Sequence, residues 1–143
     1  MTSFGRYTIG AMLVFAFIQL VPYGKQHSNP PVAKEPRWTS AETRSIARRA
    51  CFDCHSNQTQ WPWYANIAPA SWFVQWDVNE GRRRLNFSNW DQPGSDFDEA
   101  AQQVRQSDMP PWYYRTLNPE ARLQNGERQR LIAGLETVIR AAR

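Results

Sequence analysis

The chain is predicted to have an all-α fold, because helix-start signals recur along it and no strand pattern surrounds its central motif. Thr39-Ser40-Ala41-Glu42 has the form of a capping box and should begin the first helix of the folded domain. The last helix is predicted from apolar residues at the i, i+1, i+4, i+7 and i+8 positions of an amphipathic stripe. Helices are expected over residues 39–54, 69–85, 96–107 and 126–142.

The N-terminal segment is predicted to cross a membrane. Tyr7 to Gly24 is a stretch of eighteen uncharged residues, which as a helix would be ~27 Å long, close to the ~30 Å hydrocarbon thickness. A cleaved signal peptide is the alternative, but no A-x-A-like site follows the stretch. The sequence therefore predicts a single-pass signal anchor over residues 1–24 in the cytoplasmic (inner) membrane. The rest of the chain is expected on the periplasmic, extracytoplasmic side.

Composition indicates one domain with an appendage. The 143 residues include seventeen basic and thirteen acidic side chains, and no tract of one sign suggests binding to nucleic acid. Residues 25–38 contain three prolines among polar residues and are predicted to form an extended linker, in which His27 should be solvated. The folded domain is expected to cover residues 39–143.

Cys51-Phe52-Asp53-Cys54-His55 has the C-x-x-C-H spacing of a c-type haem attachment motif. Two thiols at this spacing can each form a thioether with a haem vinyl group, and the imidazole of His55 can then bind the iron. A zinc site would need two further nitrogen or sulfur ligands, and a thioredoxin-like dithiol would need a βαβ setting. One haem c, attached through Cys51 and Cys54, is therefore the expected cofactor.

The segment after the motif is rich in aromatic residues. Trp61, Trp63 and Tyr64 lie between prolines that exclude a continuous helix, so a loop placing these rings along the haem edge is expected. Ordinary packing of the loop on the core is an equal alternative for each ring. A backbone carbonyl of this segment is expected to accept the Nδ1 proton of His55 and to fix its tautomer.

Three consecutive arginines should fall in the last turn of the helix over residues 69–85. Cations suit that end of the helix dipole, and this is the expected role of at least two of them. Arg83 is the candidate to pair with a haem propionate, because a guanidinium matches carboxylate geometry.

Met109 precedes Pro110-Pro111, which should hold the backbone extended. A methionine after a helix usually packs in the core. Met109 is nevertheless the only methionine beyond the first twelve residues, and an iron bound by one histidine needs a sixth ligand or keeps an open site. Met109 is therefore the candidate sixth ligand.

Several blocks together resemble the bacterial haem-binding-domain family of monohaem c-type cytochromes. The blocks are CFDCHSN, WPWYANIAPASW, EGRRRLNFSNW, MPPWYY and NPEARLQNGERQRL, and the likeness covers about residues 38–140. The resemblance implies a cytochrome c-like fold, with thioethers at Cys51 and Cys54 and with His55 as the proximal ligand. Met109 matches the methionine of the family's M-P motif.

These observations favour an electron carrier over an enzyme, because an iron with two axial protein ligands has no free position for a substrate. The expected partner is a redox protein or a membrane respiratory or photosynthetic complex, with the chain anchored in the same membrane. The alternative is a haem-based sensor whose sixth ligand is displaceable or absent. A peroxidase-like activity is disfavoured.

Overall fold

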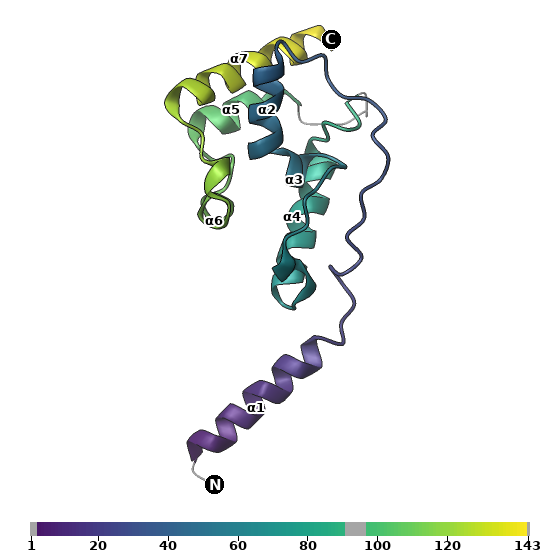
Figure 1. The fold of residues 1–143 in the computed structure, drawn as a ribbon, viewed down its shortest axis with the longest axis vertical. Coiled ribbons are helices and arrows are strands. Elements are labelled where there is room, and N and C mark those ends of the chain that lie inside the picture. The colour runs from purple at the N-terminus through teal and green to yellow at the C-terminus, as the bar shows by residue number, and fades with distance from the viewer. Residues whose placement is uncertain (1–2, 91–96, 143) are drawn as a thin grey trace. The chain divides into compact units, whose positions relative to one another are not determined.

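The computed structural model describes residues 3–90 and 97–142, and its regular elements there are helices (Figure 1). The all-α prediction is thus confirmed, whereas its likeness to cytochrome c stays a prediction. The helices are α1 (Ser3–Ile18), α2 (Ala41–Ala50), α3 (Phe52–His55), α4 (Ala70–Arg84), α5 (Phe97–Gln106), α6 (Trp112–Leu117) and α7 (Asn125–Ala141), with short 3-10 helices η1 (Trp63–Asn66) and η2 (Pro119–Ala121).

The predicted membrane anchor is wrong. Among the described residues no helix combines the length and the apolar character needed to cross a membrane. α1 has 16 residues and ends at Ile18, well before Gly24. Pro22 lacks an N–H to continue the helix, and Gly24 adopts a positive φ of 82° that helical residues do not have. The predicted location in the inner membrane depended on this anchor and is therefore also wrong.

The chain forms two compact units, and we describe each by itself. The first comprises Met1–Ser28 and Trp61–Asp77, and the second comprises Asn29–Gln60 and Val78–Arg143. The predicted domain boundaries at residues 24 and 38 stay a prediction.

In the first unit, side chains of the N-terminal region bind the segment after Trp61. Gln19 exchanges two hydrogen bonds of 2.9 Å with the backbone of Ala68. The His27 ring stacks on Trp61 with centroids 4.7 Å apart, and its Nε2 lies 3.0 Å from the carbonyl oxygen of Ala65. The expectation that His27 is simply solvated is therefore wrong.

The core of the second unit lies where α2, α5 and α7 meet (Figure 1). The predicted stripe of α7 is confirmed, because all its members are buried: Leu131, Ile132, Leu135, Val138 and Ile139. Gly134 lets α7 approach α2 closely, since a Cβ built there would lie 2.3 Å from the Thr43 methyl group. Met109 and Cys51 are partly buried and pack against this same core.

Some helix boundaries differ from the sequence prediction. The first predicted helix is broken at Cys51, whose φ of −130° separates α2 from α3. Ser40 caps α2 by accepting the Thr43 N–H at 3.0 Å. A helix over Trp112–Leu117 was not expected.

Residues 29–38, part of the linker predicted over residues 25–38, belong to the second unit and form hydrogen bonds within it. Asn29 donates a hydrogen bond of 2.9 Å to the Thr59 carbonyl. Lys34 forms an isolated parallel bridge with Asn89. This part of the chain contains no helix, and hydrogen bonds hold it in place.

Candidate functional site

The C-x-x-C-H motif forms a tight helical turn. The backbone N–H groups of Cys54 and His55 both donate to the Cys51 carbonyl, at 3.2 and 2.9 Å. Neither cysteine forms a disulfide, and both residues are partly buried. Burial raises the pKa of the Cys51 thiol to about 12, against the opposing effect of Arg49, so this sulfur stays protonated at neutral pH.

His55 is oriented by the end of α4. Its Nδ1 lies 3.0 Å from the Gly81 carbonyl oxygen and 3.1 Å from that of Leu85. Both groups accept, so Nδ1 carries the proton and the Nε2 lone pair is left for a metal. Burial lowers the pKa of His55, while the two carbonyls oppose that shift. The accepting carbonyls were expected between residues 61 and 69, so that part of the prediction is wrong.

Gly81 explains how α4 comes so close to the motif. A Cβ built at this position would lie 2.4 Å from the Cys54 carbonyl oxygen, well inside van der Waals contact. Only a residue without a side chain fits between the helix and the motif. The glycine in the middle of a helix was the available sequence signal for this contact.

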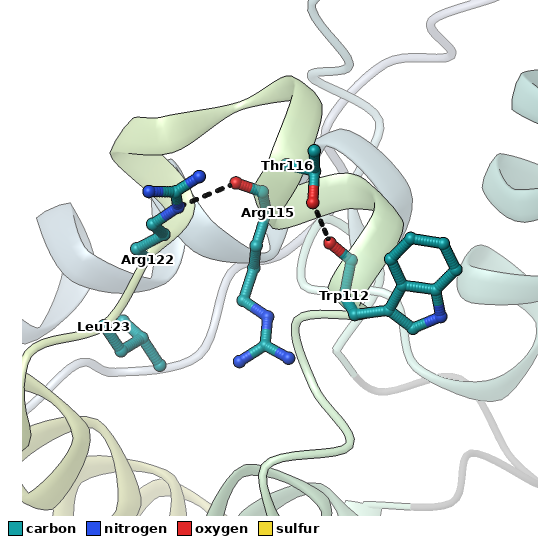
Figure 2. A pocket seen from close by; sticks show the side chains of 5 residues that line it. All are labelled: Trp112, Arg115, Thr116, Arg122 and Leu123. Carbon is teal, nitrogen blue, oxygen red and sulfur yellow. Dashed lines mark hydrogen bonds between the residues drawn. The ribbon is translucent and has the colours of Figure 1, made fainter.

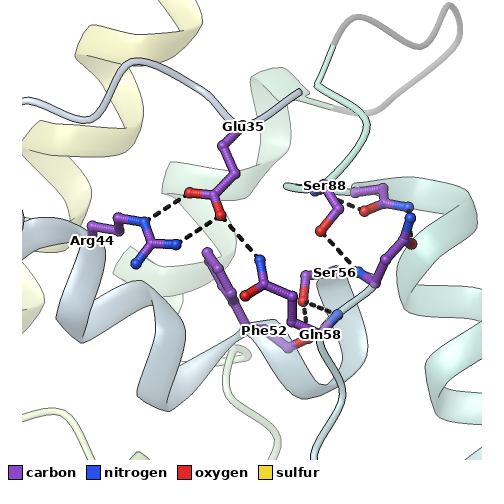
Figure 3. A network of polar contacts seen from close by, with 8 residues as sticks. Glu35, Arg44, Phe52, Ser56, Gln58 and Ser88 are labelled. Carbon is purple, nitrogen blue, oxygen red and sulfur yellow. Dashed lines mark hydrogen bonds and ion pairs between the residues drawn. The ribbon is translucent and has the colours of Figure 1, made fainter. Parts of the chain in front are cut away.

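The loop that follows His55 is fixed by a second set of hydrogen bonds, of which Figure 3 draws those of Ser56 and Ser88. The Phe87 N–H donates to the His55 carbonyl at 2.7 Å, and the Asn57 N–H donates to the Ser88 hydroxyl at 2.9 Å. The Arg82 Nε donates to the Ser56 carbonyl at 2.8 Å. The backbone on the C-terminal side of the imidazole is therefore held to residues 82–88.

A carboxylate links the same loop to α2 (Figure 3). Glu35 accepts two hydrogen bonds of 2.7 Å from the Arg44 guanidinium and one of 3.0 Å from Gln58. The Arg44 guanidinium lies over the Phe52 ring, 5.8 Å from its centroid. The Arg44 hydrogen bond is the main reason that the pKa of Glu35 is lowered from 4.5, with burial opposing it.

A side-chain hydrogen bond links the segment carrying Met109 to the motif. The Tyr114 hydroxyl on α6 donates a hydrogen bond of 2.7 Å to Asp53, which lies between the two cysteines. Burial, followed by the charge of Asp53, strongly raises the pKa of Tyr114. Met109 itself donates its N–H to the Gln103 carbonyl at 3.2 Å. Sequence reasoning missed the Tyr114–Asp53 pair, since nothing local connects residues so far apart.

None of the contacts described above involves the remaining predicted site residues. The Arg83 Nε donates to Glu80 at 3.0 Å, so Arg83 already has a carboxylate partner on its own helix. Trp61, Trp63 and Tyr64 belong to the first unit. Trp63 is 76% exposed and meets the Tyr64 ring edge-on at 5.8 Å. The structure thus brings together Cys51, Cys54 and His55, and it places Met109 on the core that Cys51 contacts.

A comparison with protein families matches residues 13–137 to a family described as the haem-binding domain. The chain belongs to the haem-binding domain family. It is therefore a haem protein. Comparisons with curated proteins and with solved structures found no significant match.

The donor set of this haem-binding domain fits a haem better than a metal ion alone. In the part of the chain that the structure describes, no three histidine, cysteine or acidic side chains converge where they would hold a metal ion. A haem needs no such cluster, because the porphyrin supplies four ligands. An imidazole whose Nδ1 donates to carbonyls, beside two cysteines that form no disulfide, fits a haem.

Proposed function

We propose that the chain carries single electrons on one haem c, attached by thioethers at Cys51 and Cys54 and bound axially by His55 and Met109. The observation that carries the proposal is the double hydrogen bond at His55 Nδ1, beside two cysteines that form no disulfide. Fixing that nitrogen as a donor leaves Nε2 as the only ring atom that can bind iron.

A haem held here would supply an iron that takes up and gives back one electron. The residues of the chain would determine how firmly the haem is held and at what potential its iron changes oxidation state. The two thioethers keep the group from dissociating, and His55 supplies a strong donor. Met109 would supply a neutral thioether, which favours ferrous iron and raises the reduction potential. With both axial positions filled by protein, no substrate site remains, which supports a carrier that exchanges electrons with a redox partner protein.

The decisive test is a spectrum of the reduced protein with and without carbon monoxide. The wild type should be six-coordinate and low-spin, and carbon monoxide should leave its spectrum unchanged on mixing. Met109→Ala should open the site, giving a high-spin ferric spectrum and rapid carbon monoxide binding. If the wild type is already high-spin and Met109→Ala changes nothing, Met109 is a core residue and the protein is a ligand-binding sensor.

Two further variants separate attachment from ligation. Cys51→Ala combined with Cys54→Ala should abolish the haem signal that survives denaturing electrophoresis. Met109→His should keep the iron six-coordinate but lower the midpoint potential, because axial ligand identity is a main control on a range of about 0.8 V. Haem that remains bound covalently without the two cysteines would contradict the proposed attachment.

A further inference from the structure

α6 and the segment after η2 border an open cavity of about 350 Å³ in the second unit (Figure 2). The cavity has one indole wall, one apolar side chain, one hydroxyl and two guanidinium groups. Its lining residues are Trp112, Arg115, Thr116, Arg122 and Leu123. None of these residues takes part in the proposed attachment or ligation of the haem.

The cavity brings two guanidinium groups together, those of Arg115 and Arg122. Within the described residues, neither Arg115 nor Arg122 forms an ion pair; Arg122 uses its Nε to donate to the Arg115 carbonyl at 3.0 Å. Elsewhere in the second unit, ion pairs with glutamates occupy Arg44, Arg49, Arg83, Arg84, Arg105 and Arg130. Two guanidinium groups that share a cavity without a carboxylate favour an anionic occupant.

The cavity is connected to the haem motif through α6. The Tyr114 hydroxyl on this helix bonds to Asp53 between the two cysteines, while Trp112, Arg115 and Thr116 of the same helix line the cavity. Trp112 is 72% exposed and lies three residues after Met109. A molecule held at the cavity would therefore contact the helix that borders the haem attachment turn.

We infer that this cavity is the docking site for carboxylate side chains of an acidic redox partner protein, an inference that rests on the proposed electron transfer. A guanidinium pairs with a carboxylate through two parallel hydrogen bonds. Exposed tryptophan and arginine are the residue types that dominate binding energy at protein interfaces. The net charge of +4 would also steer an acidic partner toward the chain.

The test is the rate at which the reduced holoprotein transfers its electron to small probes in stopped flow. Hexacyanoferrate(III) is the anionic probe: one electron leaves the ferrous haem, hexacyanoferrate(II) and ferric haem are formed, and no atoms are exchanged. Tris(phenanthroline)cobalt(III) is the cationic probe and is reduced to the cobalt(II) complex in the same way. Hexaglutamate serves as a competitor that presents the carboxylates of an acidic protein.

The variant Arg115→Gln with Arg122→Gln is compared with Arg37→Gln with Arg48→Gln, which removes the same charge from exposed positions of the same unit. At low salt, the cavity variant should react about 5-fold more slowly with hexacyanoferrate(III), and the control less than 2-fold. The cobalt probe should not be slowed in either variant. High salt should remove the difference, and hexaglutamate should slow only proteins with an intact cavity.

Equal slowing of both variants would show a net-charge effect and overturn the inference, as would unchanged rates in the cavity variant. Equal midpoint potentials in the three proteins establish that the driving force is the same. Failure of the proposed function looks different, because a chain without a reducible haem would pass no electron to either probe in any variant.

Discussion

The turn Cys51–His55 is held by backbone groups on several sides, whereas the segment that carries Met109 packs on the core and is linked to the motif through the Tyr114 side chain. On the motif side, the imidazole binds two carbonyls, Phe87 binds the His55 carbonyl, and Gly81 allows backbone contact. On the methionine side, the backbone binds Gln103, and α6 reaches the motif through the Tyr114 hydroxyl.

This difference separates two requirements of the proposed site. The ligand that must be in place when the haem is attached is oriented by the folded backbone itself. The candidate ligand on the other side, Met109, packs on the core, and its segment is linked to the motif by a hydrogen bond that one substitution can remove. Variants on the motif side should therefore cost stability, and variants on the methionine side should mainly alter ligation.

The largest expected effect is that of Gly81→Ala. The new methyl group would lie 2.4 Å from the Cys54 carbonyl oxygen and would push α4 away from the motif. We expect a loss of about 3 kcal/mol in the free energy of unfolding, measured by urea denaturation of the holoprotein. The yield of attached haem should fall as well, because the carbonyls that orient His55 would move.

Gly126→Ala is the matched control for that substitution. The nearest atom to a Cβ at residue 126 is the flexible end of Arg130, 3.8 Å away. Alanine should be neutral or should stabilise α7 by up to about 1 kcal/mol. Equal destabilisation by the two substitutions would mean that the close approach at Gly81 has no special cost.

Tyr114→Phe should have the next largest effect. It removes the hydroxyl that bonds to Asp53 at 2.7 Å and keeps the ring. We expect a loss of about 1 to 2 kcal/mol together with easier displacement of Met109, measured as tighter imidazole binding to the ferric protein. A double-mutant cycle with Asp53→Asn isolates the pair. Additive effects in that cycle would contradict a coupling between the two sides.

Glu35→Gln should have the smallest effect, and its size should depend on pH. The pKa of Glu35 is lowered from 4.5 chiefly by Arg44, so its stabilising effect is complete above pH 4.5 and is lost as pH falls through the folded-state pKa. At pH 7 we expect a cost of about 1 kcal/mol for this partly exposed bidentate pair. The difference from wild type should shrink in acid.

Glu136→Gln is the control, since its ion pair with Arg105 is more exposed, and it should cost less than about 0.5 kcal/mol. A difference between wild type and Glu35→Gln that grows below pH 4.5 would contradict the assignment.

Features that depend on residues close together in the sequence could be predicted from local patterns. The buried stripe of α7 follows from spacing alone, and the C-x-x-C-H motif indicated the cofactor that the family match supports. Contacts between distant residues left no such pattern. The partners of His55 lie at Gly81 and Leu85 because a helix passes the motif there, and the sequence pointed instead to the nearer aromatic loop.

The N-terminal prediction failed for a different reason. The uncharged stretch between Tyr7 and Gly24 suggested a long helix. The helix ends at Ile18, and Pro22 lies within the stretch that was predicted to be helical. The exposed rings on α4 show the same limit. Phe73 and Trp76 lie three residues apart on one face of α4 and are 68% and 59% exposed, so spacing alone does not indicate what covers a face.

The contact between His55 and the end of α4 also has an electronic consequence. α4 ends at Arg84, and the C-terminal end of a helix carries partial negative charge. An imidazole that donates Nδ1–H to carbonyls at this end becomes more basic and pushes more electron density through Nε2. Such a ligand favours the oxidised iron, whereas a methionine thioether favours the reduced one. Under the proposed ligation, the two ligands would have opposite effects on the reduction potential, and the carbonyls at the end of α4 would lower it by acting through His55.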